Sequence, residues 1–304
     1  MKTNGLKAWV LASRPKTLTG AIAPVLVGGT LAYTDTSHLG MQSWWLGLLC
    51  LLFAIIMQID ANLVNDYFDF KKGTDREDRL GPERACAQGW ITPQAMRWGI
   101  GLCTLLACVV GLVMMFLAQR WELLIVGVAC VVGCFLYTIK FSYLGLGDLL
   151  VLLFFGIVPV GFTYLLMTGH WTLPLTFAGI GMGLATDNLL MVNNYRDIEQ
   201  DRQSGKKTIV VRMGAQAALQ LYLWLGLVAA ILMVTVETLQ YVNEGRGWMG
   251  IPVVIVYVAM HLSNYKKMRA FTGKALNKVL GKTAAGIFLY AVVFAVSLLI
   301  NATA

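Results

Sequence analysis

The stretch WWLGLLCLLFAIIMQIDANLVNDYFDFKKG, residues 44–73, joins a long apolar run to a group of amides and carboxylates. The apolar part is typical of a helix that crosses a membrane, which needs about 20 mostly apolar residues. Helical spacing then places two amides and two carboxylates on neighbouring turns of one face: Asn62, Asn65, Asp66 and Asp69. Gly73 predicts the end of this helix, after which the chain can bring Asp75 back to the same place. Because hydrocarbon cannot solvate ionised groups, such carboxylates usually face a wet cavity that holds an ion or a charged substrate.

A second apolar segment ends in the same manner, with NNYRDIEQDRQSGKKT at residues 193–208. Asn194, Asp197 and Asp201 are three and four residues apart, which predicts that they share one helix face. Both segments fall on the side of the membrane that carries the basic loops. We therefore expect the two groups of carboxylates to face each other.

The composition belongs to a membrane protein, because the 304 residues are 58% hydrophobic and only 13% charged. Nine stretches are long and apolar enough to span a bilayer, near residues 17–34, 43–66, 95–118, 121–140, 148–168, 174–195, 215–237, 248–264 and 280–300. We expect an all-α polytopic membrane protein, a bundle of nine transmembrane helices in a single domain over residues 1–304.

The basic residues test this count, since Lys and Arg collect in cytoplasmic loops. Of the 24 in the chain, all but Arg120 and Arg246 fall before the first predicted span or in alternate loops after it. This pattern predicts a cytoplasmic N-terminus and a C-terminus outside. The net charge of +8 then lies on one face, which suits anionic lipid headgroups and an anionic substrate. We expect no nucleic-acid partner, and the sequence leaves the oligomeric state open.

Several carboxylates beside amides and cations at a membrane surface indicate a metal–diphosphate site. Bare carboxylates repel one another, and Mg²⁺ relieves that repulsion while leaving coordination positions for substrate phosphates. Neighbouring lysines and arginines then bind the phosphate oxygens that the metal does not. Helix-end charges are the simpler interpretation for Glu77, Asp78, Glu83 and Glu199. The roles of Asp60 and Asp187, which lie deeper in their segments, stay open.

At these residues the chain resembles the UbiA-type intramembrane prenyltransferases, whose pattern is NDxxD on one helix and DxxxD on another. Here the two motifs are residues 65–69 and 197–201. The longer forms, together with RPKTLTGAIAPVLVG at 14–28, GPERA at 81–85 and GLGD at 145–148, resemble the branch that prenylates 1,4-dihydroxy-2-naphthoate in menaquinone biosynthesis. One departure from the general pattern is Gly73, which stands where many members have a third Asp, with Asp75 two places later.

The resemblance implies Mg²⁺-dependent transfer of a polyprenyl group from polyprenyl diphosphate to 1,4-dihydroxy-2-naphthoate. Diphosphate and CO₂ are lost, and demethylmenaquinone forms. The metal ligands it implies are Asp66, Asp69, Asp75, Asp197 and Asp201. The catalytic groups it implies are Asp66, Asp69, Asp197, Asp201 and Lys16. The substrate-binding residues it implies are Asn62, Asn65, Lys72, Arg84, Lys140, Tyr143, Asn194, Arg196, Lys206 and Lys207. The expected location is the bacterial plasma (inner) membrane, in contact with lipid, with the site on the cytoplasmic side.

Two details of this hypothesis remain open at the level of sequence. The acceptor carboxylate needs a cation, and either Lys16 or Arg14 suits this role or that of a lipid anchor. Lys140, Tyr143 and Asp148 are candidates for orienting the acceptor hydroxyls. The alternatives to the whole hypothesis are another aromatic acceptor, such as 4-hydroxybenzoate, homogentisate or a haem precursor, and a secondary transporter, which also uses intramembrane Asp and Asn.

Overall fold

The computed structural model describes residues 2–36, 38–73, 79–241 and 251–303, and within them every regular element is helical. The elements are α1 (Leu6–Ala12), η1 (Pro15–Thr17), α2 (Thr19–Asp35), α3 (Met41–Lys72), α4 (Pro93–Ala118), α5 (Leu123–Leu136), η2 (Tyr137–Phe141), α6 (Ser142–Leu144), α7 (Gly147–Leu152), η3 (Leu153–Ile157), α8 (Val158–Thr168), α9 (Leu173–Arg196), α10 (Ile198–Gln203), α11 (Ile209–Met213), α12 (Ala215–Tyr241), α13 (Ile251–Ala270), η5 (Gly273–Ala275) and α14 (Leu276–Thr303). The predicted all-α architecture is confirmed.

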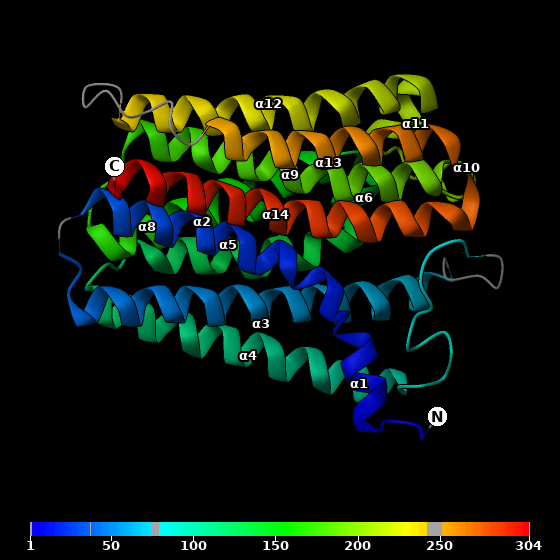
Figure 1. Cartoon of the computed structure of the whole chain (residues 1–304). Helices are drawn as coiled ribbons and strands as arrows, with labels where there is room; N and C mark the ends of the chain where they lie inside the picture. Colours follow the sequence, from blue (N-terminus) through cyan, green and yellow to red (C-terminus); the bar gives the residue numbers. More distant parts are fainter. Residues whose placement is uncertain (1, 37, 74–78, 242–250, 304) are drawn as a thin grey trace.

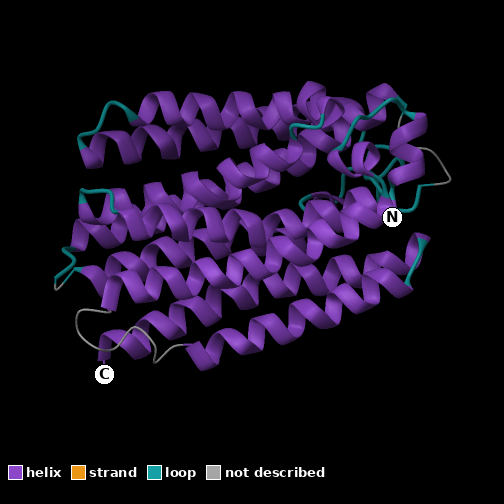
Figure 2. Ribbon diagram, turned by 90° about the horizontal axis from the view of Figure 1, so that it is seen from above, coloured by secondary structure: helices purple, strands orange, loops and turns teal. Residues whose placement is uncertain are grey.

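The long helices run side by side as one bundle (Figures 1 and 2). In the described chain, seven helices are long and apolar enough to cross a membrane, and an eighth crossing is formed if α1, η1 and α2 count as one bent span. The stretch predicted as the eighth of nine spans, near 248–264, corresponds to α13. This helix has 20 residues and packs beside α12 and α14, but its composition is too polar for the same criterion.

The largest buried core lies where α2, α8, α9, α12, α13 and α14 meet. Its centre consists of aromatic and sulfur-containing side chains that are almost completely buried: Tyr164, Met182, Met233, Tyr290 and Phe294. Helices α3 and α4 pair along their length on the other side of the bundle (Figure 1). Lipid cannot supply a hydrophobic driving force between helices, so close van der Waals packing of this kind stabilises the bundle.

Glycines allow the closest helix contacts. A Cβ at Gly156, in the π-helical turn η3, would lie 2.4 Å from the carbonyl oxygen of Gly179 and 2.6 Å from the Cα of Gly183. A Cβ at Gly28 of α2 would lie 2.4 Å from the carbonyl oxygen of Val160 in α8. These contacts hold α9 against η3, and α2 against α8, at backbone distance.

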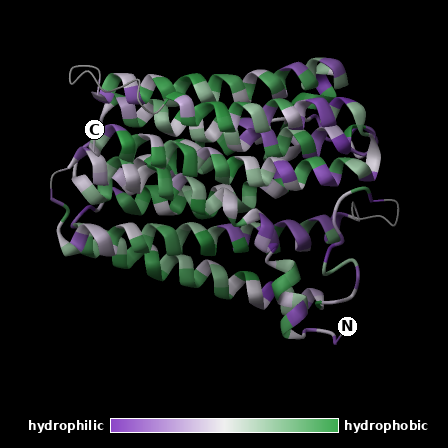
Figure 3. Ribbon diagram, viewed as in Figure 1, coloured by the Kyte–Doolittle hydropathy of each residue, from purple (hydrophilic) through white to green (hydrophobic). Residues whose placement is uncertain are grey.

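Helix α3 is much longer than a membrane span. At about 1.5 Å per residue its 32 residues extend about 48 Å, whereas the hydrocarbon core is about 30 Å thick. The excess lies at the C-terminal end, which carries Asn62 to Lys72 and ends at Gly73 with φ of +68°, as predicted. The hydrophilic end of the bundle also holds α10, α11 and the chain before α4 (Figure 3). The candidate residues therefore gather at one end of the molecule.

Candidate active site

A cavity of about 400 Å³ runs through the bundle between α2, α3, α5, η3, α8 and α9. Most of its wall is apolar, and it includes the rings of Phe53, Phe154, Phe155 and Phe162. One end is polar and is lined by Arg14, Arg79, Arg84, Asn65 and Asn193. The cavity thus joins an apolar channel to a cationic mouth at the hydrophilic end of the bundle.

The segment at residues 79–91, which we call the strap, crosses this mouth between α3 and α4. Asp66 holds it, because its two carboxylate oxygens accept hydrogen bonds from the backbone N–H groups of Ala85 (2.8 Å) and Cys86 (2.9 Å). At the other end of the strap, the Asn277 side chain of α14 donates to the carbonyl of Leu80 (2.8 Å). The strap is therefore attached to α3 and to α14.

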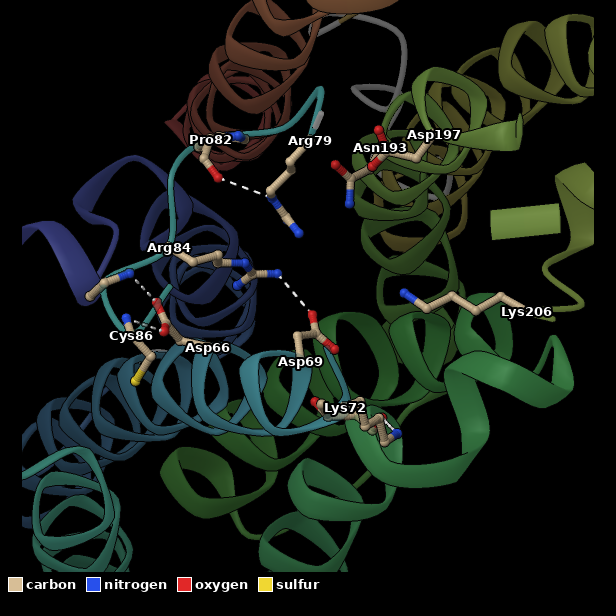
Figure 4. Close-up of polar contacts among 12 residues, drawn as sticks. Asp66, Asp69, Lys72, Arg79, Pro82, Arg84, Cys86, Asn193, Asp197 and Lys206 are labelled. Carbon is tan, nitrogen blue, oxygen red and sulfur yellow. Dashed lines mark hydrogen bonds and ion pairs between the residues drawn. The ribbon is translucent and has the colours of Figure 1, made fainter. Parts of the chain in front are cut away.

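The strap carries two arginines into the mouth of the cavity (Figure 4). Arg84 Nη2 lies 3.1 Å from Asp69 Oδ2, and both side chains are nearly buried, with exposed fractions of 6% and 8%. Arg79 donates from Nε to the carbonyl of Pro82 (3.2 Å), and its guanidinium points into the same space. Asp66 thus positions the strap, while Asp69, one turn later, faces the cavity mouth.

The second acidic group lies across this space, at the break between α9 and α10. Asp197 pairs with its neighbour Arg196 through both carboxylate oxygens, at 2.7 and 2.6 Å. Arg196 also donates to Asn277 Oδ1 (2.7 Å) and to Asn193. It therefore connects the end of α9 to the start of α14.

Asp201 of α10 is buried, and its Oδ1 lies 3.7 Å from Lys206 Nζ. Burial raises the pKa of Asp201 to about 6, although the charge of Lys206 opposes this rise. The carboxylates of Asp197 and Asp69 add to it. The two acidic groups, distant in sequence, are thus close enough to influence each other electrostatically.

A third cationic group lies beside Tyr143. Lys72 Nζ is 4.1 Å and Lys206 Nζ is 5.3 Å from the centre of the Tyr143 ring. Lys72 also donates to the carbonyls of Thr138 (3.2 Å) and Ile139 (2.9 Å) in the π-helical turn η2. This contact fixes the end of α3 against the end of α5.

The break between α1 and α2, where the chain bends by 49°, lines the cavity next to this mouth. Arg14 adopts a left-handed backbone conformation there (φ of +50°), which costs energy for a residue other than glycine. Asn62 of α3 fixes the break by donating to the carbonyl of Ser13 (2.9 Å) and to Thr17 Oγ1 (3.0 Å). The contacts of Asn62 therefore hold the break, with Arg14 in its left-handed conformation, beside the cavity.

The donor chemistry of the mouth fits Mg²⁺, since Asp69, Asp197, Asp201 and Asn193 offer the hard oxygen ligands that this ion prefers. Within the described residues, however, no three His, Cys, Asp or Glu side chains already lie close enough together to hold a metal ion. Asp69 and Asp197 instead contact arginines. A metal ion would thus replace a guanidinium on at least one of these carboxylates.

The structure brings together most of the candidate residues but not all. Lys16, Lys140 and Lys207 are exposed at the surface, and the backbone N–H of Lys207 donates to the carbonyl of Tyr143 (3.0 Å). Asp75 lies outside the described residues. Asn193 lines the cavity, whereas Asn194 is buried beside it.

Arg79, Asn193 and Asn277 are not among the site residues that the sequence predicts. The doubled asparagine at 193–194 was a signal for Asn193, but which of the two reaches the cavity depends on how α9 is rotated. Asn277 lies about 80 residues further along the chain, in a basic helix start without a motif. Only the folded chain places it beside the strap.

Comparison with known proteins gives one consistent result. The model of the UbiA prenyltransferase family matches residues 21–282. The chain is 37% identical over 218 residues to a 1,4-dihydroxy-2-naphthoate octaprenyltransferase of Haemophilus influenzae, covering 69% of this chain and 70% of the relative. It is 32% identical to the Escherichia coli protein of that name, covering 97% and 96%. The fold is similar to that of a UbiA homologue from Archaeoglobus fulgidus bound to GPP and Mg²⁺, with a TM-score of 0.63 at 15% identity and coverage of 95% and 99%.

Proposed function

Since the chain belongs to the UbiA prenyltransferase family, we propose that it transfers a polyprenyl group from polyprenyl diphosphate to 1,4-dihydroxy-2-naphthoate, with loss of diphosphate and CO₂, to give demethylmenaquinol, the hydroquinone form of demethylmenaquinone. The observation that carries the proposal is a cavity with an apolar wall and a cationic mouth beside two acidic groups. The names of the two bacterial relatives support the naphthoate acceptor.

Asp69, Asp197 and Asp201 are the residues that would hold Mg²⁺. When bound, the ion would neutralise charge that develops on the departing diphosphate. Arg79, Arg84 and Lys206, whose cationic groups lie around the mouth, would bind phosphate oxygens. Guanidinium groups can do so through two parallel hydrogen bonds. The bond between the prenyl carbon and the diphosphate oxygen then breaks, and the electron pair leaves with the diphosphate.

The apolar cavity would hold the prenyl chain and exclude water from the allylic cation. Its wall includes Tyr137 and several phenylalanines, whose ring faces stabilise positive charge. The acceptor ring carbon that carries the carboxylate then forms the new C–C bond to the allylic carbon. The bond from this ring carbon to the carboxylate breaks, CO₂ leaves, and the electron pair of that bond restores the aromatic ring.

The geometry favours Arg14 over Lys16 as the cation for the acceptor carboxylate. Arg14 lines the cavity at the helix break, whereas Lys16 is exposed at the surface. Gln58 and Thr17 line the cavity beside Arg14 and offer hydrogen-bonding groups to the acceptor hydroxyls. We therefore assign acceptor binding to this break.

The proposed setting is the bacterial plasma membrane, with nine spans, the N-terminus and the site on the cytoplasmic side, and the C-terminus outside. The alternation of 22 of the 24 basic residues supports this topology. So does the position of α1 at the hydrophilic end of the bundle while α14 ends at the opposite end (Figure 1). A phosphatase reporter fused to the C-terminus should be active, because this enzyme works only outside the cytoplasm. An inactive phosphatase with a fluorescent cytoplasmic reporter at the same place would contradict the topology.

Family membership argues against the secondary transporter, and it leaves the other aromatic acceptors as the alternative. Purified protein in liposomes would be given a polyprenyl diphosphate and 1,4-dihydroxy-2-naphthoate, with Mg²⁺ or with EDTA. We expect prenylated product and CO₂ only with Mg²⁺. Product with 4-hydroxybenzoate or homogentisate, but not with the naphthoate, would overturn the assigned acceptor.

A further inference from the structure

The buried ion pair between Arg84 and Asp69 lies where the proposed metal ligands and phosphate-binding groups meet (Figure 4). Burying such a pair costs desolvation energy, which the attraction between the two charges offsets only while both partners are present. Removing Arg84 takes away the hydrogen-bonded partner of the buried Asp69 carboxylate, while the charges of Lys206, Arg79, Arg14 and Lys72 still act on it. Arg84 and a divalent cation therefore compete for the same carboxylate.

The competition has different results for a cation alone and for a cation with diphosphate. A cation that arrives alone must displace Arg84 from Asp69 and leave the guanidinium without this carboxylate. A diphosphate that arrives with the cation offers Arg84 phosphate oxygens as new acceptors. The cost of breaking the ion pair is then offset within the same site.

The anchors of the strap allow this exchange. The segment around Arg84 is held by hydrogen bonds from Ala85 and Cys86 to Asp66, and from Asn277 to Leu80. None of these bonds involves Asp69. The Arg84 side chain can consequently turn from Asp69 towards a phosphate while the strap backbone remains in place.

Arg196 differs from Arg84 in this respect. Its guanidinium contacts Asp197, Asn193 and Asn277 together, and so connects α9 to α14. Turning it away from Asp197 would also break these other contacts. The exchange is therefore assigned to Arg84 and not to Arg196.

We propose that Arg84 is an exchangeable counter-ion of Asp69, so that a divalent cation binds Asp69 tightly only together with a diphosphate. The inference rests on the proposed function, in which this site takes a metal–diphosphate. It adds that the free site resists metal, and that Arg84 produces this resistance. By linkage, diphosphate and cation then raise each other's affinity by the same factor.

The test measures binding rather than turnover. Mn²⁺ would be titrated into purified full-length protein, and the free Mn²⁺ would be measured by electron paramagnetic resonance. The titration would be done with and without geranyl diphosphate, and no acceptor would be added. For the unmodified protein we expect geranyl diphosphate to raise Mn²⁺ affinity by roughly 5- to 150-fold, the usual range of coupling between sites.

Arg84→Gln should make Mn²⁺ alone bind more tightly than it does to the unmodified protein, and should reduce the effect of geranyl diphosphate. Arg84→Lys keeps the charge but cannot form two parallel hydrogen bonds. Its affinity for Mn²⁺ alone should therefore lie between those of the unmodified protein and Arg84→Gln. Arg202→Gln is the matched control, because Arg202 is an exposed arginine on the same face, paired with Glu199. It should behave like the unmodified protein.

The outcomes separate the inference from the proposed function. If Mn²⁺ alone binds no more tightly to folded Arg84→Gln and Arg84→Lys than to the unmodified protein, the counter-ion role is wrong while the metal–diphosphate site stands. If geranyl diphosphate fails to promote Mn²⁺ binding even in the unmodified protein, the metal–diphosphate site itself is wrong. A single cooperative thermal transition establishes that each variant is folded, even where the melting temperature of an Arg84 variant lies below that of the Arg202→Gln control.

Discussion

Asp66 and Asp69 lie one turn apart on α3, yet their carboxylates have different partners. Asp66 accepts two backbone hydrogen bonds from the strap, and Asp69 faces an arginine at the cavity mouth. The sequence presents them as equivalent members of one acidic group, because the spacing shows only that they share a face. Their difference arises from the path of residues 79–91, which no local pattern specifies.

Asp66→Ala should destabilise the protein and release the strap. The change leaves two buried N–H groups without acceptors, and each unsatisfied group costs about 1–3 kcal/mol. We expect a lower melting temperature and faster proteolysis within residues 79–91. Glu199→Ala, which removes an exposed ion pair worth about 0–1 kcal/mol, is the control. Equal melting temperatures for the two variants would contradict the anchoring role of Asp66.

Arg14→Gln should weaken acceptor binding selectively. A hydrogen bond to a charged group contributes about 1.5–3 kcal/mol, which corresponds to a rise in acceptor KM of roughly 10- to 150-fold. The KM for polyprenyl diphosphate should change much less. Lys16→Gln is the matched control, because it removes an exposed cation two residues away. A similar rise in acceptor KM in both variants would contradict the assignment to Arg14.

The sequence left the choice between Arg14 and Lys16 open for a physical reason. Both stand in RPKTL, and only the left-handed backbone at Arg14, with the 49° bend, turns the first towards the cavity. Similarly, Asn193 lines the cavity in place of the predicted Asn194, because the rotation of α9 decides which of the two faces it. Residue types were thus predictable here, while side-chain direction was not.

At the scale of elements, hydrophobic length predicted most of the spans to within a few residues. The breaks inside them were missed. The predicted span at 121–140 is α5 followed by the π-helical turn η2, whose carbonyls at Thr138 and Ile139 accept from Lys72. Such turns depend on contacts with a neighbouring helix, so apolar length alone does not reveal them.

Gly156→Ala should be among the more disruptive single-methyl additions in the chain. The added Cβ would meet the backbone of α9 at 2.4 Å, and overpacking of this kind costs about 1–3 kcal/mol. Gly101→Ala in α4 is the control, because its Cβ would meet nothing within 4 Å. Thermal unfolding in detergent should show a lower melting temperature for Gly156→Ala but not for Gly101→Ala. Equal melting temperatures would mean that η3 and α9 can separate without cost.

At the scale of the whole molecule, the sequence predicted a membrane bundle with its chemistry at one end. It did not predict the cavity, because the wall is formed by α2, α3, α5, η3, α8 and α9 together. The distance between the two acidic groups could not be predicted from the sequence either, since it depends on how α3 packs relative to α9. The length of prenyl chain that the protein accepts likewise depends on the whole cavity.

Gly127→Phe should shorten the substrate that the protein accepts. Gly127 lines the cavity on α5 near the end away from the cationic mouth, and a Cβ there meets nothing within 4 Å. A phenyl ring can therefore enter the cavity without displacing backbone. We expect turnover with geranyl diphosphate to persist and turnover with long polyprenyl diphosphates to fall by at least about tenfold, which is about 1.4 kcal/mol.

Gly101→Phe controls for the added bulk, because Gly101 is exposed on α4 and also has open space around it. It should leave the ratio of long-chain to short-chain turnover unchanged. Loss of both activities in Gly127→Phe, with a normal melting temperature, would mean that the short substrate also needs this end of the cavity.

The length of α3 links the chemistry to the lipid around it. One continuous helix passes through the hydrocarbon and then carries the carboxylates beyond it, so their height above the membrane is set by how the apolar part of α3 matches the bilayer. A mismatch between the apolar length of α3 and the bilayer thickness costs only fractions of a kcal/mol per Å. The helix can therefore tilt or shift along the membrane normal when the membrane thickness changes. In thick bilayers the mouth would approach the headgroups, and in thin ones it would stand clear of them. The acyl-chain length of the surrounding lipids should thus influence how easily a substrate with a charged diphosphate headgroup enters the cavity.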